Sequence, residues 1–523
     1  MGPHKQARKP GRRTRVATEP GTGLLFTKIL ATLGPASGSI DSIESMIAAG
    51  ARAFRINFSH GTLEEHAVTL ANVRAASERV GEPIAVVGDL CGPKMRLGQV
   101  VDGGVTLATG TRVEFSKTDM LAVAPAEGEP AVFSTTYSDL VDEVQPGQRV
   151  LLDDGKVSLT CIGHEGYGEA RRLLCEVLHG GTVTSRKGIN LPDTELSTPA
   201  LTDRDRECAR FAVEHGVDFL ALSFVRSCTD VAQLRDFLRQ LGVPGGRQHK
   251  GDTTNEPGER PPIPVISKIE KPQALDDLEG IILESEFIMV ARGDLGVEMD
   301  VADVPVIQKQ LIRRCHEHGR PVIVATQMLE SMIAAPNPTR AEVSDVANAI
   351  IDGADVVMLS GETAVGQWPV EAVRMMNRVA TRTNDFRRSQ TATVSTPREK
   401  ETQAAALAHG VASMTRGLDA RLVVLWAEFD DAVIHLSQSR LGIPILACCS
   451  KPDLLRRVQL LHGVKPVSMD EPADPAEFLK RTDALVQAEG WAGLGDSIIY
   501  VYSVRQEQSS LSNLVYIHQV GSL

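Results

Sequence analysis

The chain has 523 residues, of which 42% are hydrophobic and 23% are charged, so it is long enough for several globular domains. Its formal net charge is −12, and the first twenty residues carry six Lys or Arg and one acid, which leaves −17 for the remainder. Such an acidic body argues against a nucleic-acid partner. The eight cysteines lack metal-ligand spacing and no apolar run is long enough to cross a bilayer. We therefore expect no membrane partner and a cytoplasmic location.

Beyond a basic stretch at residues 1–23, short apolar segments alternate with helical segments about every thirty residues. This is the repeat of a parallel (β/α)8 TIM barrel. The spacing of Thr339 and Glu342 predicts a capping box at the start of the helix before the last strand. Eight strands are expected, at residues 27–34, 51–60, 84–90, 217–226, 264–270, 287–294, 321–327 and 354–362.

The repeat is interrupted after residue 92 by Gly-, Val- and Thr-rich segments with short alternating patterns. These predict an inserted all-β domain with Gly/Pro hinges. A second α/β module follows the barrel, with strands expected at residues 420–427, 443–449 and 497–504. Residues 243–262 are polar and read as a surface loop, and residues 1–23 as a disordered tail, with a transit peptide or an anion-binding arm as alternatives. The expected domains are the tail 1–23, the barrel 24–92 with 190–385, the β-barrel lid 93–189 and the C-terminal α/β domain 386–523.

Charged side chains follow two neighbouring predicted strands. Lys268 and Glu270 are two residues apart, so they face the same side at the end of one strand, and Asp294 follows the next strand. The carboxyl ends of barrel strands converge on one open face. Two carboxylates there suit Mg²⁺, which binds one or two carboxylates together with water and substrate oxygens. For a single such pair, a buried salt bridge is the alternative interpretation.

Polar groups also follow most of the other predicted strands. So many charges would be an unfavourable way to build a core, because each buried charge needs a partner. If these charged groups gather at one open end of the barrel, they predict a pocket for a small, multiply charged anion, in which Lys and Arg hold phosphate or carboxylate. The residues at these strand ends are Arg55, Asn57, Asp89, Lys268, Glu270, Arg292, Asp294, Thr326, Ser360 and Glu362.

Nine segments now resemble the motifs of one known family, pyruvate kinase, in the family's order. They are TKILATLGPAS, FRINFSHG, GPKMRLG, SRKGINLP, ISKIEK, IMVARGDLGVE, VATQMLESM, PTRAEVSDVANAI and DGADVVMLSGETAVG. One such block would be weak evidence, whereas nine in order are highly specific. The resemblance covers residues 27–375 and, more loosely, the C-terminal domain. It implies a homotetrameric glycolytic enzyme that transfers a phosphoryl group from phosphoenolpyruvate to ADP, giving pyruvate and ATP.

The resemblance also implies roles for individual residues. Glu270 and Asp294 would hold Mg²⁺ or Mn²⁺, and Lys268 would stabilise the transferring phosphoryl group. Arg55 would bind phosphate. The carboxylate end of the substrate would lie against Gly293, Asp294 and Thr326.

Two further groups of residues follow from the same match. Ser360 and Glu362 would support delivery of a proton, through water, to the enolate. The nucleotide, ADP or ATP, would be bound by Asn57, Phe58, Ser59, His60, Arg96 and Lys187.

One departure concerns a monovalent cation. Relatives that require K⁺ bind it at the positions that match Asn57, Ser59, Asp89 and Leu90, and they carry a glutamate where this chain has Lys94. An ammonium group can physically replace a monovalent cation, and Leu90 also fits the K⁺-independent branch of the family. We therefore expect K⁺ not to be required. The alternative is that Lys94 is only a solvated hinge residue.

A second departure concerns the C-terminal domain, where many relatives bind sugar phosphates. Its first turn, at residues 427–431, reads AEFDD, and its late loop, at residues 508–513, reads QSSLSN. Acids and missing glycines leave few free N–H groups for a phosphate. We expect no binding of fructose bisphosphate in the usual way.

Two other functions remain open at this point. One is a different Mg²⁺-dependent barrel enzyme acting on phosphoenolpyruvate or an oxoacid, such as a mutase or lyase, although such enzymes need no nucleotide-binding lid. The other is a non-catalytic regulatory paralogue, against which the intact Lys268, Glu270, Asp294 and Thr326 argue.

Overall fold

The computed structural model describes residues 24–126, 128–244, 262–389, 403–505 and 511–522, so the predicted tail and most of the predicted 243–262 loop lie outside the described residues. Two compact units divide the chain, residues 28–377 on the one hand and residues 24–27 with 378–522 on the other. Within the described residues, no helix is both long and apolar enough to cross a bilayer.

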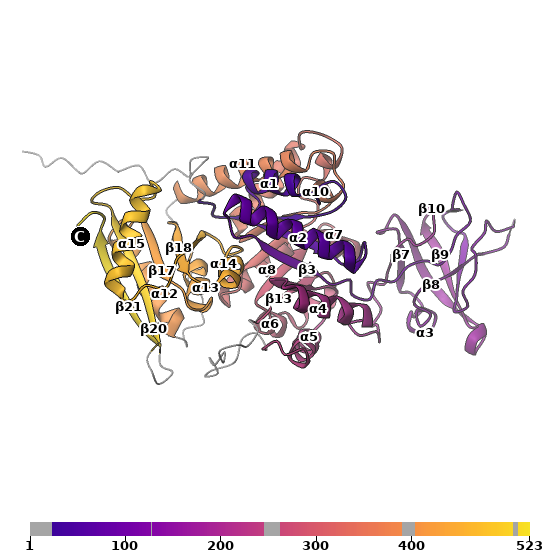
Figure 1. Cartoon of the computed structure of the whole chain (residues 1–523). Coiled ribbons are helices and arrows are strands. Elements are labelled where there is room, and N and C mark those ends of the chain that lie inside the picture. Colours follow the sequence, from indigo (N-terminus) through magenta and orange to yellow (C-terminus); the bar gives the residue numbers. More distant parts are fainter. Residues whose placement is uncertain (1–23, 127, 245–261, 390–402, 506–510, 523) are drawn as a thin grey trace, which may run out of the picture. The chain divides into compact units, whose positions relative to one another are not determined.

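The first unit contains a closed parallel barrel with the strand order β1-β16-β15-β14-β13-β12-β3-β2, which confirms the predicted TIM barrel. Figure 1 labels β3 and β13 of this barrel together with several of its helices. Every neighbouring pair is parallel, and closure comes from the pairing of β1 with both β16 and β2. The barrel strands are β1 Lys28–Thr32, β2 Ala53–Asn57, β3 Ala85–Asp89, β12 Phe219–Leu222, β13 Val265–Ile269, β14 Phe287–Ala291, β15 Val322–Ala325 and β16 Val356–Leu359.

Mostly apolar runs form these strands because both faces are covered, one by the barrel interior and one by helices. All five residues of β14 are buried, and so are all five of β13, including Lys268. The predicted capping box is present at the start of α9, where Thr339 and Glu342 exchange hydrogen bonds. The helices of this unit are α1 Ile40–Ala49, α2 Leu63–Val80, α4 Asp203–His215, α5 Cys228–Gln240, η2 Pro272–Leu275, α6 Leu278–Glu284, α7 Arg292–Glu298, α8 Val304–Glu317, η3 Glu330–Ile333, α9 Arg340–Asp352, α10 Gly361–Ala364 and the greater part of α11 Pro369–Ser389.

The insertion between β3 and α4 is built from two sheets, in the orders β11-β7-β8-β9-β5-β6 and β10-β4. Its apolar core includes Phe115, Phe133 and Leu159. At the hinges, Leu97 N–H donates to the carbonyl of Lys187, and Arg96 pairs with Gly188 in antiparallel fashion. The elements are β4 Val105–Leu107, β5 Arg112–Ser116, β6 Ala131–Ser134, α3 Leu140–Glu143, β7 Arg149–Leu152, β8 Val157–Glu165, η1 Gly168–Ala170, β9 Arg172–His179, β10 Gly181–Val183 and β11 Ile189–Asn190.

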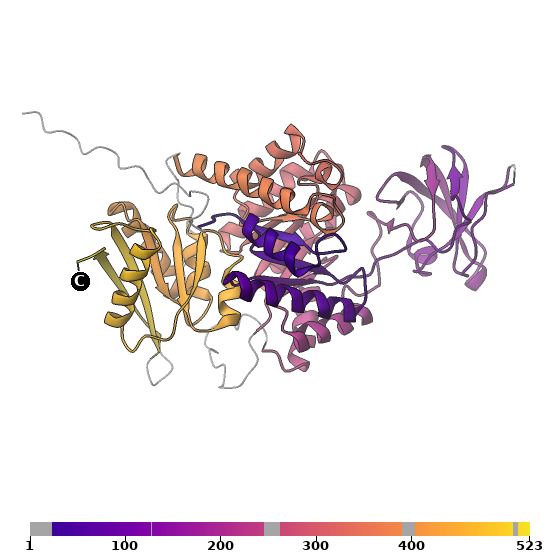
Figure 2. The ribbon, with the colours of Figure 1, turned by 45° about the horizontal axis from the view of Figure 1, so that its top comes forward.

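The second unit contains a five-stranded sheet in the order β19-β18-β17-β20-β21. The Phe478 ring of α15 packs against Trp426, Tyr500 and Tyr502 of the sheet. This helix, coloured yellow in Figure 2, therefore lies on one face of the sheet. The elements are α12 Gln403–Gly417, β17 Leu422–Trp426, α13 Asp431–Gln438, β18 Ile445–Cys449, α14 Pro452–Val458, β19 Val464–Ser468, α15 Pro475–Ala488, β20 Ser497–Arg505 and β21 Leu511–Gln519.

The sequence predicted three of these strands and missed β19 and β21. β19 reads VKPVS, in which Lys and Pro hide the strand pattern, and as an edge strand it tolerates the proline. β21 is the other edge strand and begins at Leu511. Residues 511–513, which were predicted to belong to the late loop, therefore belong to this strand. The rest of that predicted loop lies outside the described residues.

Candidate active site

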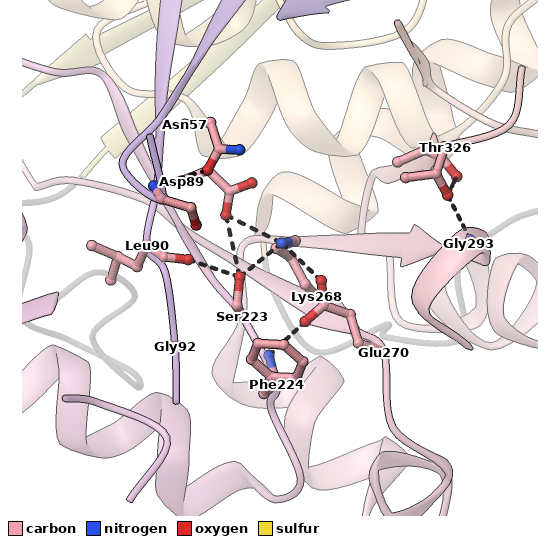
Figure 3. A network of polar contacts seen from close by, with 12 residues as sticks. Asn57, Asp89, Leu90, Gly92, Ser223, Phe224, Lys268, Glu270, Gly293 and Thr326 are labelled. Atoms are coloured by element: carbon pink, nitrogen blue, oxygen red, sulfur yellow. Dashed lines mark hydrogen bonds and ion pairs between the residues drawn. The ribbon is translucent and has the colours of Figure 1, made fainter. Parts of the chain in front are cut away.

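The ammonium group of Lys268 lies at the centre of a polar network at the carboxyl ends of β3, β12 and β13 (Figure 3). Lys268 Nζ lies 2.8 Å from Glu270 Oε1 and 3.3 Å from Asp89 Oδ1, and it donates to Ser223 Oγ at 2.7 Å. Arg55, in the middle of β2, extends the network because its Nε lies 2.6 Å from the second oxygen of Asp89. The ends of three strands and the side chain of Arg55 from β2 therefore contribute to one charged cluster, as expected from the sequence.

The charges in this cluster determine one another's protonation. Burial lowers the pKa of Lys268, but the carboxylates of Asp89 and Glu270 outweigh burial and hold that pKa above its usual value. Burial likewise raises the pKa of Asp89, but Lys268 and Arg55 outweigh it and keep this pKa below its usual range. Lys268 is therefore a permanent cation near neutral pH, suited to stabilise negative charge rather than to accept a proton.

Two carboxylates provide oxygen ligands beside this lysine. Glu270 is buried, and its Oε2 accepts from the Phe224 N–H at 2.7 Å. Asp294 is half-buried in the first turn of α7, and its carboxylate has no hydrogen-bond or ion-pair partner among the described residues. Burial holds the pKa of Glu270 above its usual value, opposed by Lys268 and reinforced by the charge of Asp294. This excess negative charge fits a hard divalent cation with oxygen ligands.

Thr326 and Gly293 meet across the neighbouring strand ends of β15 and β14. Gly293 N–H donates to Thr326 Oγ1 at 2.7 Å, so the two residues predicted to bind one end of the substrate do lie together (Figure 3). Thr326 has φ 66°, an unusual conformation for a β-branched residue. Arg292 holds this turn, since its guanidinium donates to the carbonyls of Thr326 and Gln327, each at 2.9 Å.

Ser360 and Glu362 follow β16, at the other side of β15. Glu362 is buried and accepts from the N–H groups of Ser360 and Leu329 at 2.7 and 3.0 Å. Burial raises the pKa of Glu362, against the effect of these N–H donors. The Ser360 hydroxyl is buried and lacks a hydrogen-bond partner among the described residues.

The predicted nucleotide-binding residues form a second, cationic group. Burial lowers the pKa of His60, and the nearby charges of Lys94, Arg96 and Arg55 lower it further. Arg96 pairs with Gly188, the residue after Lys187, on the two hinge segments, and Lys187 Nζ is 2.8 Å from Asp153 Oδ1.

Phe58 differs from the other predicted nucleotide-binding residues. Its ring is buried, with edge contacts to His66 and Phe211, so only its backbone reaches the barrel end.

Two hydrogen bonds involve residues of the predicted monovalent-cation region. Asn57 Oδ1 accepts from Ser59 N–H at 3.1 Å, and the Leu90 carbonyl accepts from Ser223 Oγ at 2.8 Å. Lys94 is exposed, and its ammonium group makes no hydrogen bond or ion pair with any described residue. The replacement of K⁺ by Lys94 stays a prediction.

Sequence reasoning missed Ser223 and Phe224, which follow β12. Ser223 links Lys268 to Leu90, and Phe224 donates its N–H to Glu270 from a backbone with φ 55°. The strand-end argument applied to the fourth strand would have found Ser223. Nothing in the sequence marks Phe224, because its contribution comes from an N–H in an unusual backbone conformation.

Gly92, in the first hinge, has φ 64° and lies against the Phe224 ring. An added Cβ would lie 2.5 Å from Phe224 Cδ2. We expect Gly92→Ala to lower the free energy of unfolding by about 2 kcal/mol, because overpacking adds to the unfavourable φ. Chemical denaturation measures this effect. Gly81→Ala is the matched control, since φ there is 73° but no atom lies within 4 Å of the added Cβ, so an equal loss in both variants would contradict the role of the ring.

A closed parallel barrel with a buried lysine, an arginine and carboxylates gathered at the carboxyl ends of its strands defines a (β/α)8 enzyme for an anionic substrate. Comparison with known proteins agrees with this class of enzyme. Residues 25–373 match the model of "Pyruvate kinase, barrel domain" and residues 380–518 that of "Pyruvate kinase, alpha/beta domain". The chain belongs to the pyruvate kinase family and is a phosphotransferase.

Individual relatives cover almost the whole chain. A pyruvate kinase of Mycobacterium intracellulare is 38% identical over 94% of this chain and 98% of its own length. One of Corynebacterium glutamicum is 37% identical over 95% and 98%, respectively. Among solved structures, a pyruvate kinase from Cryptosporidium parvum aligns with a TM-score of 0.84 and 32% identity, over 97% of this chain and 98% of that one.

Proposed function

We propose that this chain transfers the phosphoryl group of phosphoenolpyruvate to ADP, giving pyruvate and ATP. The observation that carries the proposal is the position of Lys268, whose permanent positive charge lies between Asp89, Ser223 and Glu270 at the barrel mouth. Phosphoryl transfer depends mainly on positioning and on charge neutralisation. Lys268 would neutralise charge on the transferring group, and Arg55, anchored by Asp89, would hold the phosphate oxygens.

Mg²⁺ or Mn²⁺ bound to Glu270 and Asp294 would supply further positive charge to the phosphate and carboxylate oxygens of the substrate. The unpartnered carboxylate of Asp294 and the raised pKa of Glu270 support this assignment. Phe224 N–H orients Glu270 by binding the oxygen that does not face Lys268. The side chains thus hold their positions through contacts within the barrel.

The other end of the substrate would lie against Thr326, Gly293 and Asp294, which the β14 and β15 ends bring together. Ser360 and Glu362 would direct a water molecule that gives its proton to the enolate carbon. The buried, unpaired Ser360 hydroxyl supports this role. Because Glu362 is fixed by two N–H donors, it would orient this water rather than move itself.

The nucleotide would be bound by residues 57–60 together with Arg96 and Lys187. The support is the gathering of Arg55, Lys94 and Arg96 near His60. Because Arg96 and Lys187 lie on the two hinge segments, closing of the insertion would bring cations to the nucleotide and exclude water. Such exclusion would limit hydrolysis of the transferring group.

Fructose bisphosphate would not bind in the C-terminal unit in the usual way. The turn after β17 leads into α13, and one of its acids, Asp430, lies near a cation of the same unit, with Arg457 Nε 3.6 Å from Asp430 Oδ2. A phosphate there would meet carboxylates first. The homotetramer and the cytoplasmic location also stay predictions.

We further propose that catalysis needs no K⁺, because the ammonium group of Lys94 takes its place. We expect full formation of ATP from phosphoenolpyruvate, ADP and Mg²⁺ in K⁺-free buffer. In Lys94→Glu, activity without K⁺ should fall and added K⁺ should restore it, since a carboxylate recreates the need for a cation. A luciferase assay of ATP measures both effects.

Each result of this assay has a distinct meaning. If the unmodified protein is active only in the presence of K⁺, the assignment as a kinase stands and the role of Lys94 is refuted. No activity in either buffer, with Mg²⁺ and phosphoenolpyruvate still bound, would favour a non-catalytic paralogue. Consumption of phosphoenolpyruvate without ATP formation would favour a mutase or lyase.

A further inference from the structure

The turn after β12, residues 223–226, contacts the charged cluster at the barrel mouth. Ser223 Oγ accepts from Lys268 Nζ at 2.7 Å, and Phe224 N–H donates to Glu270 Oε2 at 2.7 Å (Figure 3). Phe224 has φ 55°, in the left-handed region that residues with a Cβ rarely adopt, so contacts around the turn hold it there. The position of this turn therefore helps to set the positions of Lys268 and Glu270.

The same turn contacts both hinges of the insertion. The Phe224 ring lies against Gly92 of the first hinge. Arg226 donates from Nη1 to the Leu196 carbonyl at 2.8 Å and from Nη2 to the Thr198 carbonyl at 2.9 Å, in the part of the second hinge that follows β11. One short segment of the barrel thus contacts the two connections of the insertion as well as the charged cluster.

Arg226 is suited to hold the second hinge firmly. Its guanidinium is planar and presents its N–H donors in a fixed fork, so it binds two carbonyls at once. The backbone of the residue is fixed to α5, because Arg226 N–H donates to Asp230 Oδ2 at 2.9 Å, and Arg226 Nη2 also lies 3.8 Å from Asp230 Oδ1. The Arg226 side chain therefore fixes the second hinge relative to the start of α5.

We propose that Arg226 is a positioning residue for the nucleotide, because it fixes the hinge that carries Lys187. This inference rests on the proposed function, in which Lys187 binds ADP when the insertion closes. Without the two hydrogen bonds of Arg226, the hinge would shift and Lys187 would not reach the nucleotide in the required geometry. The contacts of Ser223 and Phe224 with the charged cluster do not involve the Arg226 side chain, so binding of phosphoenolpyruvate should change little.

Arg74 provides a matched control. It lies in α2 and donates to the carbonyls of Ile84 at 3.0 Å and Gly216 at 2.8 Å, and its Nη2 lies 2.9 Å from Asp218 Oδ2. Its side chain is 26% exposed, against 24% for Arg226. Ile84 and Gly216 precede β3 and β12, so Arg74 binds at the amino ends of the strands, at the opposite end of the barrel from the site. It therefore makes the same kind of contacts without touching a hinge.

The test compares Arg226→Met with Arg74→Met in the full chain, by steady-state kinetics and by hydrogen exchange of the ligand-free protein. In Arg226→Met, we expect KM for ADP to rise about tenfold, kcat and KM for phosphoenolpyruvate to stay within about threefold, and the amides of residues 188–198 to exchange faster. In Arg74→Met, we expect an unchanged KM for ADP. Arg226→Lys should recover only part of the affinity for ADP, because an ammonium group lacks the fork of donors. It is also the deciding variant if Arg226→Met folds poorly.

Three results would overturn the role of Arg226, since each would show a purely structural arginine: an unchanged KM for ADP, an equal rise of KM for both substrates, or the same rise in Arg74→Met. Failure of the proposed function is a separate result. If the unmodified protein forms no ATP, titration calorimetry with ADP and Mg²⁺ still compares nucleotide binding. About tenfold weaker binding in Arg226→Met than in the unmodified protein would then support the role of Arg226 and refute only the kinase. Equal binding, or no binding by the unmodified protein, would refute the role of Arg226 as well.

Discussion

Replacing Lys268 with methionine is expected to lower kcat by about a thousandfold, because it removes the central cation of the site while keeping the length of the side chain. The change also leaves Asp89 and Glu270 buried with one positive partner fewer. Removing one partner from a buried ion pair costs about 3 kcal/mol of stability. Steady-state kinetics and chemical denaturation measure the two effects separately.

Lys271→Met is the matched control for this change. Lys271 is also a buried lysine, and its Nζ lies 2.7 Å from Glu298 Oε1, in a second buried ion pair. We expect a similar loss of stability in this variant, but a kcat within about tenfold of the unmodified protein. If both variants lost kcat equally, the loss would reflect disruption of the barrel rather than the charge of Lys268.

The barrel could be predicted from the sequence because its signals are local and repeated. Each strand is a short apolar run such as FIMVA or VIVA, and Thr339 and Glu342 mark the start of a helix. The edge strands β19 and β21 of the C-terminal sheet could not be predicted in the same way. An edge strand is covered less completely, so its sequence is freer to include polar residues and proline.

The sequence predicts those parts of the site that consist of charged side chains. Lys268, Glu270 and Arg55 follow from their positions in strands or directly after them, and the structure brings them into one network. The Phe224 N–H and the left-handed turn at Thr326 were not predictable, because backbone conformation at a strand end depends on contacts from distant segments. Arg292 illustrates this, since its guanidinium holds the carbonyls of residues more than thirty positions away.

Asp294→Asn is expected to weaken Mn²⁺ binding by about a hundredfold or more while leaving the fold intact. The carboxylate of Asp294 has no partner among the described residues and adds to the repulsion on buried Glu270. Its removal therefore relieves repulsion, but it also gives up the favourable interaction of an acid with the first turn of α7, about 0.5 kcal/mol. These effects oppose each other, so the free energy of unfolding should change by less than about 1 kcal/mol. A Mn²⁺ titration of the substrate-free protein and chemical denaturation test both statements.

Glu342→Gln should show the opposite pattern. Glu342 accepts from Ser331 N–H at 2.7 Å, from Thr339 N–H at 2.7 Å and from the hydroxyls of both residues, so it is fully used within the fold. We expect a loss of about 2 kcal/mol of stability with unchanged Mn²⁺ affinity. Marked destabilisation of Asp294→Asn would mean that its carboxylate serves the structure, and unchanged Mn²⁺ affinity would remove it from the metal site. The combination of lost metal binding with retained stability identifies a carboxylate that the fold leaves free for a ligand.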